Sequence, residues 1–285
     1  SKFRNREYIS SNLSSILSLF LGFCPLNLWL SDKKQGKYKI YHLRLGLCKS
    51  RILKIMANIL NIETSSKTCS VALSKRDKVI ASLTAEGTFT HAKELTTLID
   101  DLLKANDLKI DDIDAVAVNA GPGSYTALRV GYSVAKGLCF GADLKMLAHS
   151  SFEILNSQAK LMDQFSSLDC VVPVVDARRD EVYMIAYDEI GSEIIDAQSF
   201  VLDEEALKIT IGTKKNILII GDAAEKSRNY LKGEEFSFKE VAIMAPMMAS
   251  LSWDKYQSSA WENVAYTIPF YLKPPNIVKS KKKYF

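Results

Sequence analysis

The stretch that decides the fold runs from residue 114 to residue 138, DAVAVNAGPGSYTALRVGYSVAKGL. Its first part, residues 114–119, is an apolar run of the kind that forms a buried strand in a parallel sheet. Two glycines in the segment GPGS, residues 121–124, then allow a tight turn, and the residues up to Leu138 are predicted to be a helix. A strand, a glycine-rich turn and a helix in this order indicate an α/β protein.

The segments on either side extend this unit. Residues 58–63, 69–74 and 79–84 are predicted to be three short strands, and apolar residues recur at helical spacing over residues 92–103. Residues 144–148 are predicted to be a further strand. The order of three strands, a helix, a strand and a helix is typical of one ribonuclease-H-like half.

A second half begins at residue 170. Strands are predicted at residues 170–176, 181–187 and 217–220, and a helix at residues 246–256. Together the halves predict an α/β fold of two duplicated ribonuclease-H-like lobes, the actin-like, sugar-kinase and Hsp70 type. We expect the first lobe, with partner-binding helices, at 56–160, the second lobe at 161–273, and a basic tail at 274–285.

Charge is distributed unevenly along the 285 residues. The composition, 47% hydrophobic and 25% charged, is that of a globular protein and excludes disordered, collagen-like and disulfide-dense classes. Residues 1–55 hold 11 Lys and Arg against 2 Asp and Glu, whereas the rest of the chain has a net charge of −5. A basic arm of this kind binds nucleic acid or membrane, or it is an unrelated sequence joined at Met56.

We expect residues 1–55 to be an extension translated from upstream of Met56, outside the functional fold. They show neither a sustained amphipathic period nor a succession of strands and turns. The alternatives are a targeting or anchoring arm and an ordered added element. Residues 9–30 have about the length of a membrane span, but they contain Pro25 and two Asn, so we expect no membrane contact.

Polar residues at strand ends are the candidates for nucleotide binding. In a nucleotide-binding fold of this type, such turns face the phosphates, an acidic residue holds a metal through water, and a helix N-terminus attracts the anion. The alternative is a set of polar strand ends and a capped turn without a ligand. The predicted nucleotide-binding residues are Glu63, Thr64, Ser65, Gly121, Gly123, Ser124 and Asp176.

The sequence offers neither a metal site nor a catalytic set. None of the three histidines has a partner at ligand spacing. The five cysteines form no C-x-x-C pair, and Cys69, Cys139 and Cys170 lie in apolar runs, as the reduced core thiols of cytosolic proteins do. We therefore predict no catalytic residue and no metal ligand.

Two helices, residues 92–103 and 126–138, are the candidates for contact with a partner. The first is apolar over more than one stripe, and the second carries several small residues. Such a helix is either fully buried inside its domain or packed against a second protein. The predicted interface residues are Leu95, Leu98, Leu102, Leu128, Gly131, Tyr132 and Ala135.

Three segments together resemble the TsaB family of tRNA threonylcarbamoyladenosine biosynthesis proteins. They are ILNIETS at residues 59–65, AGPGSYTALRVG at 120–131 with AKG at 135–137, and DARRDEVY at 176–183. The likeness extends from about Met56 to residue 273 and leaves out residues 1–55. Two residues depart from the family pattern: Glu63 stands where Asp is usual, which weakens the case for a metal–phosphate contact, and Ala127 stands where Gly is usual.

The resemblance implies a cytoplasmic scaffold subunit that is not an enzyme by itself. Its first-lobe helices would pair with the catalytic paralogue TsaD, and the ATPase TsaE would join the complex. The complex transfers a threonylcarbamoyl group to the adenosine beside the anticodon of tRNAs that read codons starting with A. The paralogue's metal-binding H-x-x-x-H motif falls on Ser151 and Leu155 of this chain.

The same resemblance sets the expected ligands and assemblies. We expect no tightly bound cofactor, or else ATP or ADP with Mg²⁺ at the heterodimer interface. Contact with tRNA would be indirect, and the chain alone would form a homodimer.

Two rival functions belong to other classes. The first is an active peptidase or phosphotransferase of the actin-like fold, which would require Glu63 or Asp176. The second is an RNA-binding module that uses Lys279 and residues 281–283 of the tail.

Overall fold

A computed structural model of the chain describes residues 28–34, 37–43, 56–85, 91–212 and 214–274. The chain divides into two compact units, residues 1–53 and 54–285, and each is described by itself. Within these described ranges, no helix has both the length and the apolar character needed to cross a membrane. The predicted basic tail, with Lys279 and residues 281–283, lies outside the described residues apart from Pro274.

The first unit contains a β-hairpin. Strand β1 (Leu28–Lys34) pairs antiparallel with β2 (Lys37–Leu43), from Leu28 opposite Leu43 to Lys34 opposite Lys37. The expectation that residues 1–55 hold no strands and turns is therefore wrong for these two segments. Both contain Trp, Tyr or Ile, which favour strands, but polar and apolar residues do not alternate strictly in either. The pairing itself, rather than a sequence period, defines them.

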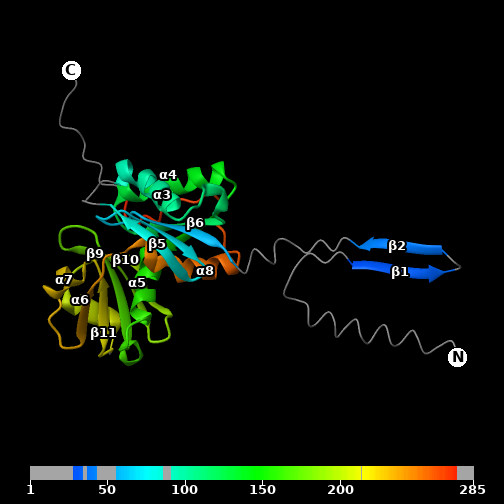
Figure 1. The fold of residues 1–285 in the computed structure, drawn as a ribbon. Helices are drawn as coiled ribbons and strands as arrows, with labels where there is room; N and C mark the ends of the chain where they lie inside the picture. The colour runs from blue at the N-terminus through cyan, green and yellow to red at the C-terminus, as the bar shows by residue number, and fades with distance from the viewer. Residues whose placement is uncertain (1–27, 35–36, 44–55, 86–90, 213, 275–285) are drawn as a thin grey trace, which may run out of the picture. The chain divides into compact units, whose positions relative to one another are not determined.

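The first sheet of the second unit has the strand order β5-β4-β3-β6-β7. Strands β6 and β7 run parallel to β3, and β4 and β5 continue the sheet antiparallel. Two helices, α3 and α4, cover one face (Figure 1). The elements of this lobe are β3 (Asn58–Glu63), β4 (Ser70–Lys75), β5 (Lys78–Thr84), α3 (His91–Ala105), η1 (Ile110–Asp112), β6 (Ala115–Gly121), α4 (Tyr125–Gly141) and β7 (Lys145–Ser150).

The second sheet has the strand order β10-β9-β8-β11-β12, with β8, β11 and β12 parallel. Its central strand β8 is buried from Cys170 to Val175, which is why the sequence there is a continuous apolar run. The elements are η2 (Phe165–Ser167), β8 (Cys170–Asp176), β9 (Glu181–Asp188), β10 (Glu193–Val201), α6 (Glu204–Ile211), β11 (Ile217–Gly221), α7 (Ala224–Arg228) and β12 (Phe236–Glu240).

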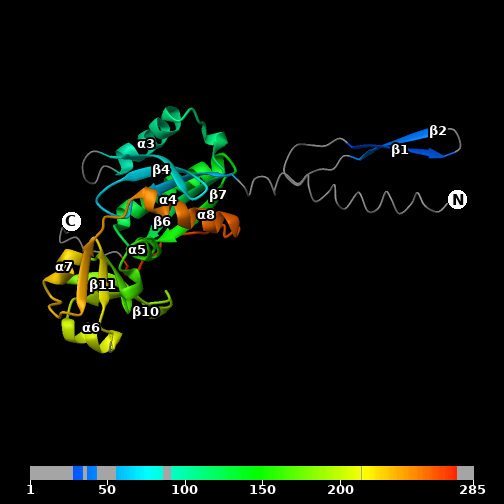
Figure 2. The ribbon, with the colours of Figure 1, turned by 60° about the horizontal axis from the view of Figure 1, so that its bottom comes forward.

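Helix α5 (Ser151–Lys160) lies between the two sheets, as Figures 1 and 2 both show. It begins with a capping box, in which Ser150 Oγ accepts from the Glu153 amide at 3.0 Å and the Glu153 carboxylate accepts from the Ser150 amide at 2.8 Å. Its apolar side chains join residues of both sheets, such as Ile59 and Val175, in one buried cluster. The lobes therefore share an apolar core.

The chain returns to the first sheet after β12. Helix α8 (Ala249–Gln257) packs on β3 and β7, preceded by the short turn η3 (Ala245–Met248). Farther on, the Glu262 amide donates to the Met146 carbonyl of β7 at 2.8 Å. The predicted second lobe, residues 161–273, thus includes a C-terminal part that packs with the first lobe. The apolar side of α8 is covered by that sheet, a long-range contact that no local pattern specifies.

Candidate functional site

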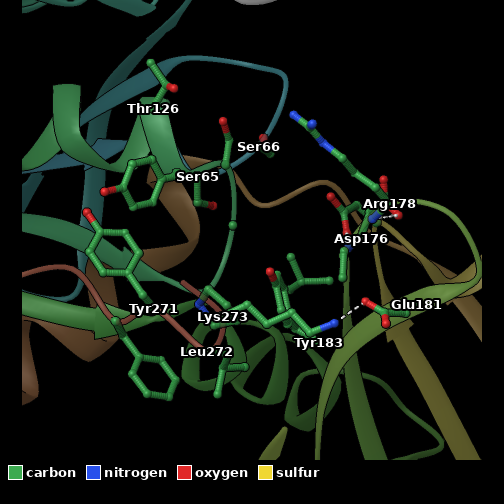
Figure 3. A pocket seen from close by; sticks show the side chains of 18 of the residues that line it. Ser65, Ser66, Thr126, Asp176, Arg178, Glu181, Tyr183, Tyr271, Leu272 and Lys273 are labelled. Carbon is green, nitrogen blue, oxygen red and sulfur yellow. Dashed lines mark hydrogen bonds and ion pairs between the residues drawn. The ribbon is translucent and has the colours of Figure 1, made fainter. Parts of the chain in front are cut away.

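A cleft of about 510 Å³ lies between the lobes, at the carboxyl ends of β3, β6, β8 and β11 (Figure 3). It has the volume of a small-molecule site. Its wall is formed by residues 65–67, 122–126, 175–178 and 270–274, with Glu181 and Tyr183 from β9 and Asp222 after β11. Open α/β sheets bind ligands at such carboxyl ends, so this cleft is the candidate site.

The glycine-rich turn packs directly against the end of β3. A Cβ atom at Gly123 would lie 2.5 Å from the Ser65 carbonyl oxygen, so only glycine fits there. Gly121 has a φ of +101°, which L-residues with side chains rarely adopt. The Ser124 amide donates to the Ser65 carbonyl at 2.7 Å. These contacts bring the start of α4 to the floor of the cleft.

Glu63 lies behind the cleft rather than in it. Its carboxylate is fully buried: Oε1 accepts from the amide and the hydroxyl of Ser65, at 2.5 and 2.6 Å, and Oε2 accepts from Asn119 Nδ2 at 2.5 Å. Burial raises the pKa of Glu63 to about 7, against the lowering effect of these hydrogen bonds. Glu63 is therefore not among the residues that line the cleft.

The other predicted nucleotide-binding residues divide into two groups. Ser65, Gly123, Ser124 and Asp176 line the cleft. Thr64 does not, because it is buried and its Oγ1 donates to the Ala127 carbonyl at 2.9 Å. Gly121 is likewise buried beneath the turn, against Leu128 and the Phe270 carbonyl. Strand ends can be identified from sequence, but which side chain at each end faces the cleft depends on the twist of the sheet.

Groups that attract an anion gather around the cleft. The amides at the start of α4 carry the positive end of the helix dipole, and the Ser124 side chain makes no capping hydrogen bond. Lys67, Arg178 and Lys273 contribute positive charge. These three residues were not predicted, because lysines and arginines are common in loops and no spacing distinguishes them in the sequence.

Two aspartates mark the ends of the second-lobe strands. Asp176 is exposed, and its Oδ1 accepts from Lys226 Nζ at 2.7 Å and from the Arg178 amide at 3.1 Å. Asp222 Oδ1 accepts from the Asp176 amide at 2.9 Å. Burial, with the nearby carboxylates, raises the pKa of Asp222 to about 6. Asp222 was not predicted, although it follows an apolar run as Asp176 does.

An aromatic pair forms part of the cleft wall. The rings of Tyr125, at the start of α4, and Tyr271, from the C-terminal segment, have centroids 4.8 Å apart. The Arg129 guanidinium lies 4.2 Å from the centroid of Tyr125. This tilted ring pair joins residues that are distant in sequence, so no local pattern pointed to Tyr271.

Within the described residues, no group of three or more His, Cys, Asp or Glu is placed to hold a metal ion. His149 is buried, and its Nε2 lies 3.0 Å from Ser252 Oγ. Ser151 and Leu155, at the two positions of the H-x-x-x-H motif, are also fully buried. Ser151 Oγ lies 2.8 Å from the Pro122 carbonyl and 3.1 Å from Asn119 Oδ1, where it supports the glycine-rich turn.

The residues predicted for a partner interface lie mostly in the core. Leu95, Leu102, Leu128, Gly131, Tyr132 and Ala135 are buried within the first lobe, and Leu98 is partly buried. A helical period selects the face toward the sheet as readily as a face toward a partner, so the sequence pattern alone does not separate the two faces. The exposed stripe of α4 consists of Thr126, Arg129, Ser133, Gly137 and Phe140.

Comparisons with known proteins agree with this architecture. A family model described as TsaD, tRNA N6-adenosine threonylcarbamoyltransferase, matches residues 83–283. A Haemophilus influenzae protein described as tRNA threonylcarbamoyladenosine biosynthesis protein TsaB is 38% identical over 126 residues, which is 44% of this chain and 51% of that protein. An Escherichia coli protein of the same description is 34% identical over 135 residues, 47% of this chain and 57% of that one.

The chain spans about half the length of the curated relatives it matches. Among solved structures, YeaZ from Pseudomonas aeruginosa has a TM-score of 0.63 and 24% sequence identity, covering 76% of this chain and 100% of that one. The likeness concerns the fold, and it confirms the predicted α/β class with two sheets.

Proposed function

The chain belongs to the tRNA N6-adenosine threonylcarbamoyltransferase (TsaD) family, in its TsaB branch, and from this we propose that it is a partner subunit in tRNA threonylcarbamoyladenosine synthesis. It scaffolds a TsaD-like catalytic paralogue, with a TsaE-like ATPase as a third component, in the cytoplasm. The complex transfers a threonylcarbamoyl group to the adenosine beside the anticodon of tRNAs that read codons starting with A. This chain reaches tRNA through its partners.

The observation that supports the scaffold role is the residue type and the burial of Ser151 and Leu155. These positions correspond to the histidines that would bind metal in the catalytic paralogue. Both side chains are fully buried and pack inside the protein, with Ser151 Oγ at the Pro122 carbonyl. A hydroxyl and an alkyl group in this place do not bind a metal ion, so the transfer chemistry belongs to the partner.

The exposed stripe of α4 supports a helix-on-helix contact with that partner. Ser133 and Gly137 are small and exposed, and a Cβ at Gly137 would meet nothing within 4 Å, so another helix can approach closely there. Phe140 is 87% exposed at the end of the stripe. A large exposed aromatic side chain beside small residues is typical of a protein interface. The same stripe would serve a homodimer when the paralogue is absent.

The cleft fits the phosphates of ATP or ADP. Its volume, the start of α4, and Lys67 and Arg178 match a polyphosphate in size and charge. A magnesium ion held mainly by phosphates and water needs only one or two protein carboxylates, and Asp176 is the exposed carboxylate that would hold it. Bound there, Mg²⁺ would neutralise phosphate charge. Glu63 does not fit this role, because both of its oxygens are occupied inside the protein.

Reconstitution tests the proposal. Purified paralogue, ATPase, tRNA, ATP, bicarbonate, threonine and the enzyme that makes threonylcarbamoyl-adenylate are combined with and without this chain, and the modified nucleoside is quantified. We expect modification only when the chain is present. Full-rate modification in its absence would exclude the scaffold role, and modification without the paralogue would make this chain the enzyme.

A matched pair of variants tests the interface. Phe140→Ser removes the exposed aromatic group of α4, whereas Ile190→Ser removes an 80% exposed apolar side chain from the second lobe. We expect Phe140→Ser to reduce co-purification of the paralogue and Ile190→Ser to leave it unchanged. If the two variants affected co-purification equally, the proposal that α4 forms part of the interface would be wrong.

A further inference from the structure

Ser65 occupies a position between a buried carboxylate and the cleft. Its hydroxyl oxygen lies 2.6 Å from Glu63 Oε1 and 3.0 Å from Asn119 Nδ2, and the residue also lines the cleft. A serine hydroxyl has one proton to donate. While Glu63 is ionised, that proton is committed to its carboxylate. Ser65 then has no hydroxyl proton left to donate to an anion in the cleft.

Protonation of Glu63 would reverse this hydrogen bond. A neutral carboxyl group has one O–H donor, and Oε1 is the oxygen nearest to Ser65 Oγ. Ser65 would then accept from Glu63, and its own proton would rotate toward the cleft. The bond from the Ser65 amide to Oε1 and the bond from Asn119 to Oε2 would remain, because each oxygen keeps a lone pair. No backbone movement is needed.

The surroundings of Glu63 favour such a change near neutral pH. In the described part of the chain, no Lys or Arg forms an ion pair with it. Asp222 faces it from the second lobe and raises its pKa further, with Lys67 beside Asp222, and Cys69 faces it from the loop before β4. Strand β6 and helix α5 contribute only the uncharged Asn119 and Ser151 to this network. Burial is the main cause that places the pKa of Glu63 at about 7.

We propose that the cleft binds a phosphate-class anion together with one proton, which Glu63 takes from solvent so that Ser65 can donate to the anion. This inference rests on the proposed nucleotide site and adds its regulation. The anion makes Glu63 harder to ionise, and by linkage the protonated form binds the anion more tightly. Glu63 is thus a positioning residue for the ligand, acting through the Ser65 hydroxyl.

Calorimetry of ADP binding to the full chain with its paralogue tests the inference between pH 7.5 and 9. In this range the terminal phosphate of ADP, with a pKa of about 6, keeps its charge. We expect the affinity to fall by up to about tenfold per pH unit, and buffers of different ionisation enthalpy to report uptake of nearly one proton per ADP. The variants Glu63→Gln and Ser65→Ala should each abolish this pH dependence.

Infrared spectroscopy measures the protonation of Glu63 directly and needs no ligand. It tests the inference on the wild-type chain even if one of the variants fails to fold. We expect the wild-type chain to show a protonated-carboxyl band that titrates near pH 7, that persists in Ser65→Ala and that is lost in Glu63→Gln. The Asp222 carboxyl, whose pKa burial raises to about 6, contributes a separate titration that both variants keep. If ADP does not bind at any pH, the proposed nucleotide site fails and this inference with it. If ADP binds with an affinity independent of pH, or no carboxyl titrates near pH 7, only the inference fails.

Discussion

Gly131 in the second turn of α4 lies against Thr64 at the end of β3, so closely that a Cβ on Gly131 would be 2.4 Å from Thr64 Oγ1. Thr64 Oγ1 in turn donates to the Ala127 carbonyl, one turn earlier in the same helix, at 2.9 Å. These two contacts position the start of α4 relative to the strand end that forms the floor of the cleft. Helix position and site geometry therefore depend on one glycine.

Gly131→Ala is expected to destabilise the protein. The added methyl group must displace a buried threonine, and overpacking of this kind costs about 1–3 kcal/mol. Gly137→Ala is the matched control in the same helix, because a Cβ there meets nothing within 4 Å. That control should stabilise the protein by about 0.5–1 kcal/mol, since alanine favours helices. Urea unfolding measures both free energies, and similar values for the two variants would contradict the contact.

His149 and Glu63 are expected to make opposite contributions to the pH dependence of stability. Burial lowers the pKa of His149 to about 3, from 6.5, and raises that of Glu63 to about 7, from 4.5. Between pH 4.5 and 6.5, unfolding lets His149 bind a proton and makes Glu63 release one. Each group alone changes the free energy of unfolding by up to about 1.4 kcal/mol per pH unit, with opposite signs, so the two largely cancel.

Two variants, each made together with Asp222→Asn because burial also raises the pKa of that carboxyl, separate these contributions. In His149→Gln the Glu63 contribution remains, and stability should fall as pH rises from 4.5 toward 7. In Glu63→Gln the His149 contribution remains, and stability should fall as pH drops below 6.5. Urea unfolding of both variants at pH 5 and pH 6 decides the question. If the free energy of unfolding of both variants changes in the same direction between pH 5 and pH 6, the opposite contributions assigned to His149 and Glu63 are wrong.

The C-terminal segment is expected to connect the two lobes across the cleft. The Phe270 amide donates to the Ala120 carbonyl of the first lobe at 2.7 Å, and Lys273 pairs with Glu181 of the second lobe. Replacing the lysine, in Lys273→Met, should speed deuterium exchange in a peptide covering residues 267–274. The double exchange Glu181→Lys with Lys273→Glu should restore slow exchange, most clearly at low salt.

Lys104→Met is the control for that experiment. It removes an exposed ion pair with Asp100 within α3, which does not join the lobes. Exchange in residues 267–274 should be unchanged by it. If the two lysine variants behave alike, or the charge exchange restores nothing, the segment is held by other contacts.

Cys69, Cys139 and Cys170 are expected to react with a thiol reagent only after unfolding. All three are buried free thiols, and burial is the largest cause that raises their pKa values, to about 12, 11 and 12. The thiolate is the reactive form, so both access and ionisation are suppressed. A reagent titration at pH 8 with and without denaturant, followed by peptide mapping to separate these three from Cys24 and Cys48, measures their reaction. Rapid modification of any of these thiols in the folded protein would contradict its burial.

Much of the fold was predictable because local patterns specify it. Strands β3 and β8 begin and end at the predicted residues, since each is an apolar run with a polar residue at its carboxyl end. Strands β10 and β12 and helices α5 to α7 were missed. Strand β10 alternates weakly along an exposed edge, and the short helices α6 and α7 carry little periodic signal.

The candidate site was only partly predictable. The strand ends and the glycine-rich turn could be located from the sequence. Four residues predicted at these places line the cleft: Ser65, Gly123, Ser124 and Asp176. Glu63 was assigned a role in the cleft because, in a nucleotide-binding fold of this type, the turn after the strand faces the phosphates and its acidic residue holds a metal through water. In this protein Asn119 and Ser65 enclose the carboxylate, and that enclosure arises only when β6 lies beside β3.

By itself, the sequence determined the central strands of both sheets, the two helices α3 and α4 and the position of the glycine-rich turn, because hydrophobic period and backbone freedom act over a few residues. Only the tertiary structure decided which face of α4 is exposed, that Tyr271 and Lys273 from the C-terminal segment form a wall of the cleft, and that Glu63 is buried. These features depend on contacts between residues far apart in the chain. Solvent exposure and pKa are properties of such contacts, and no local pattern contains them.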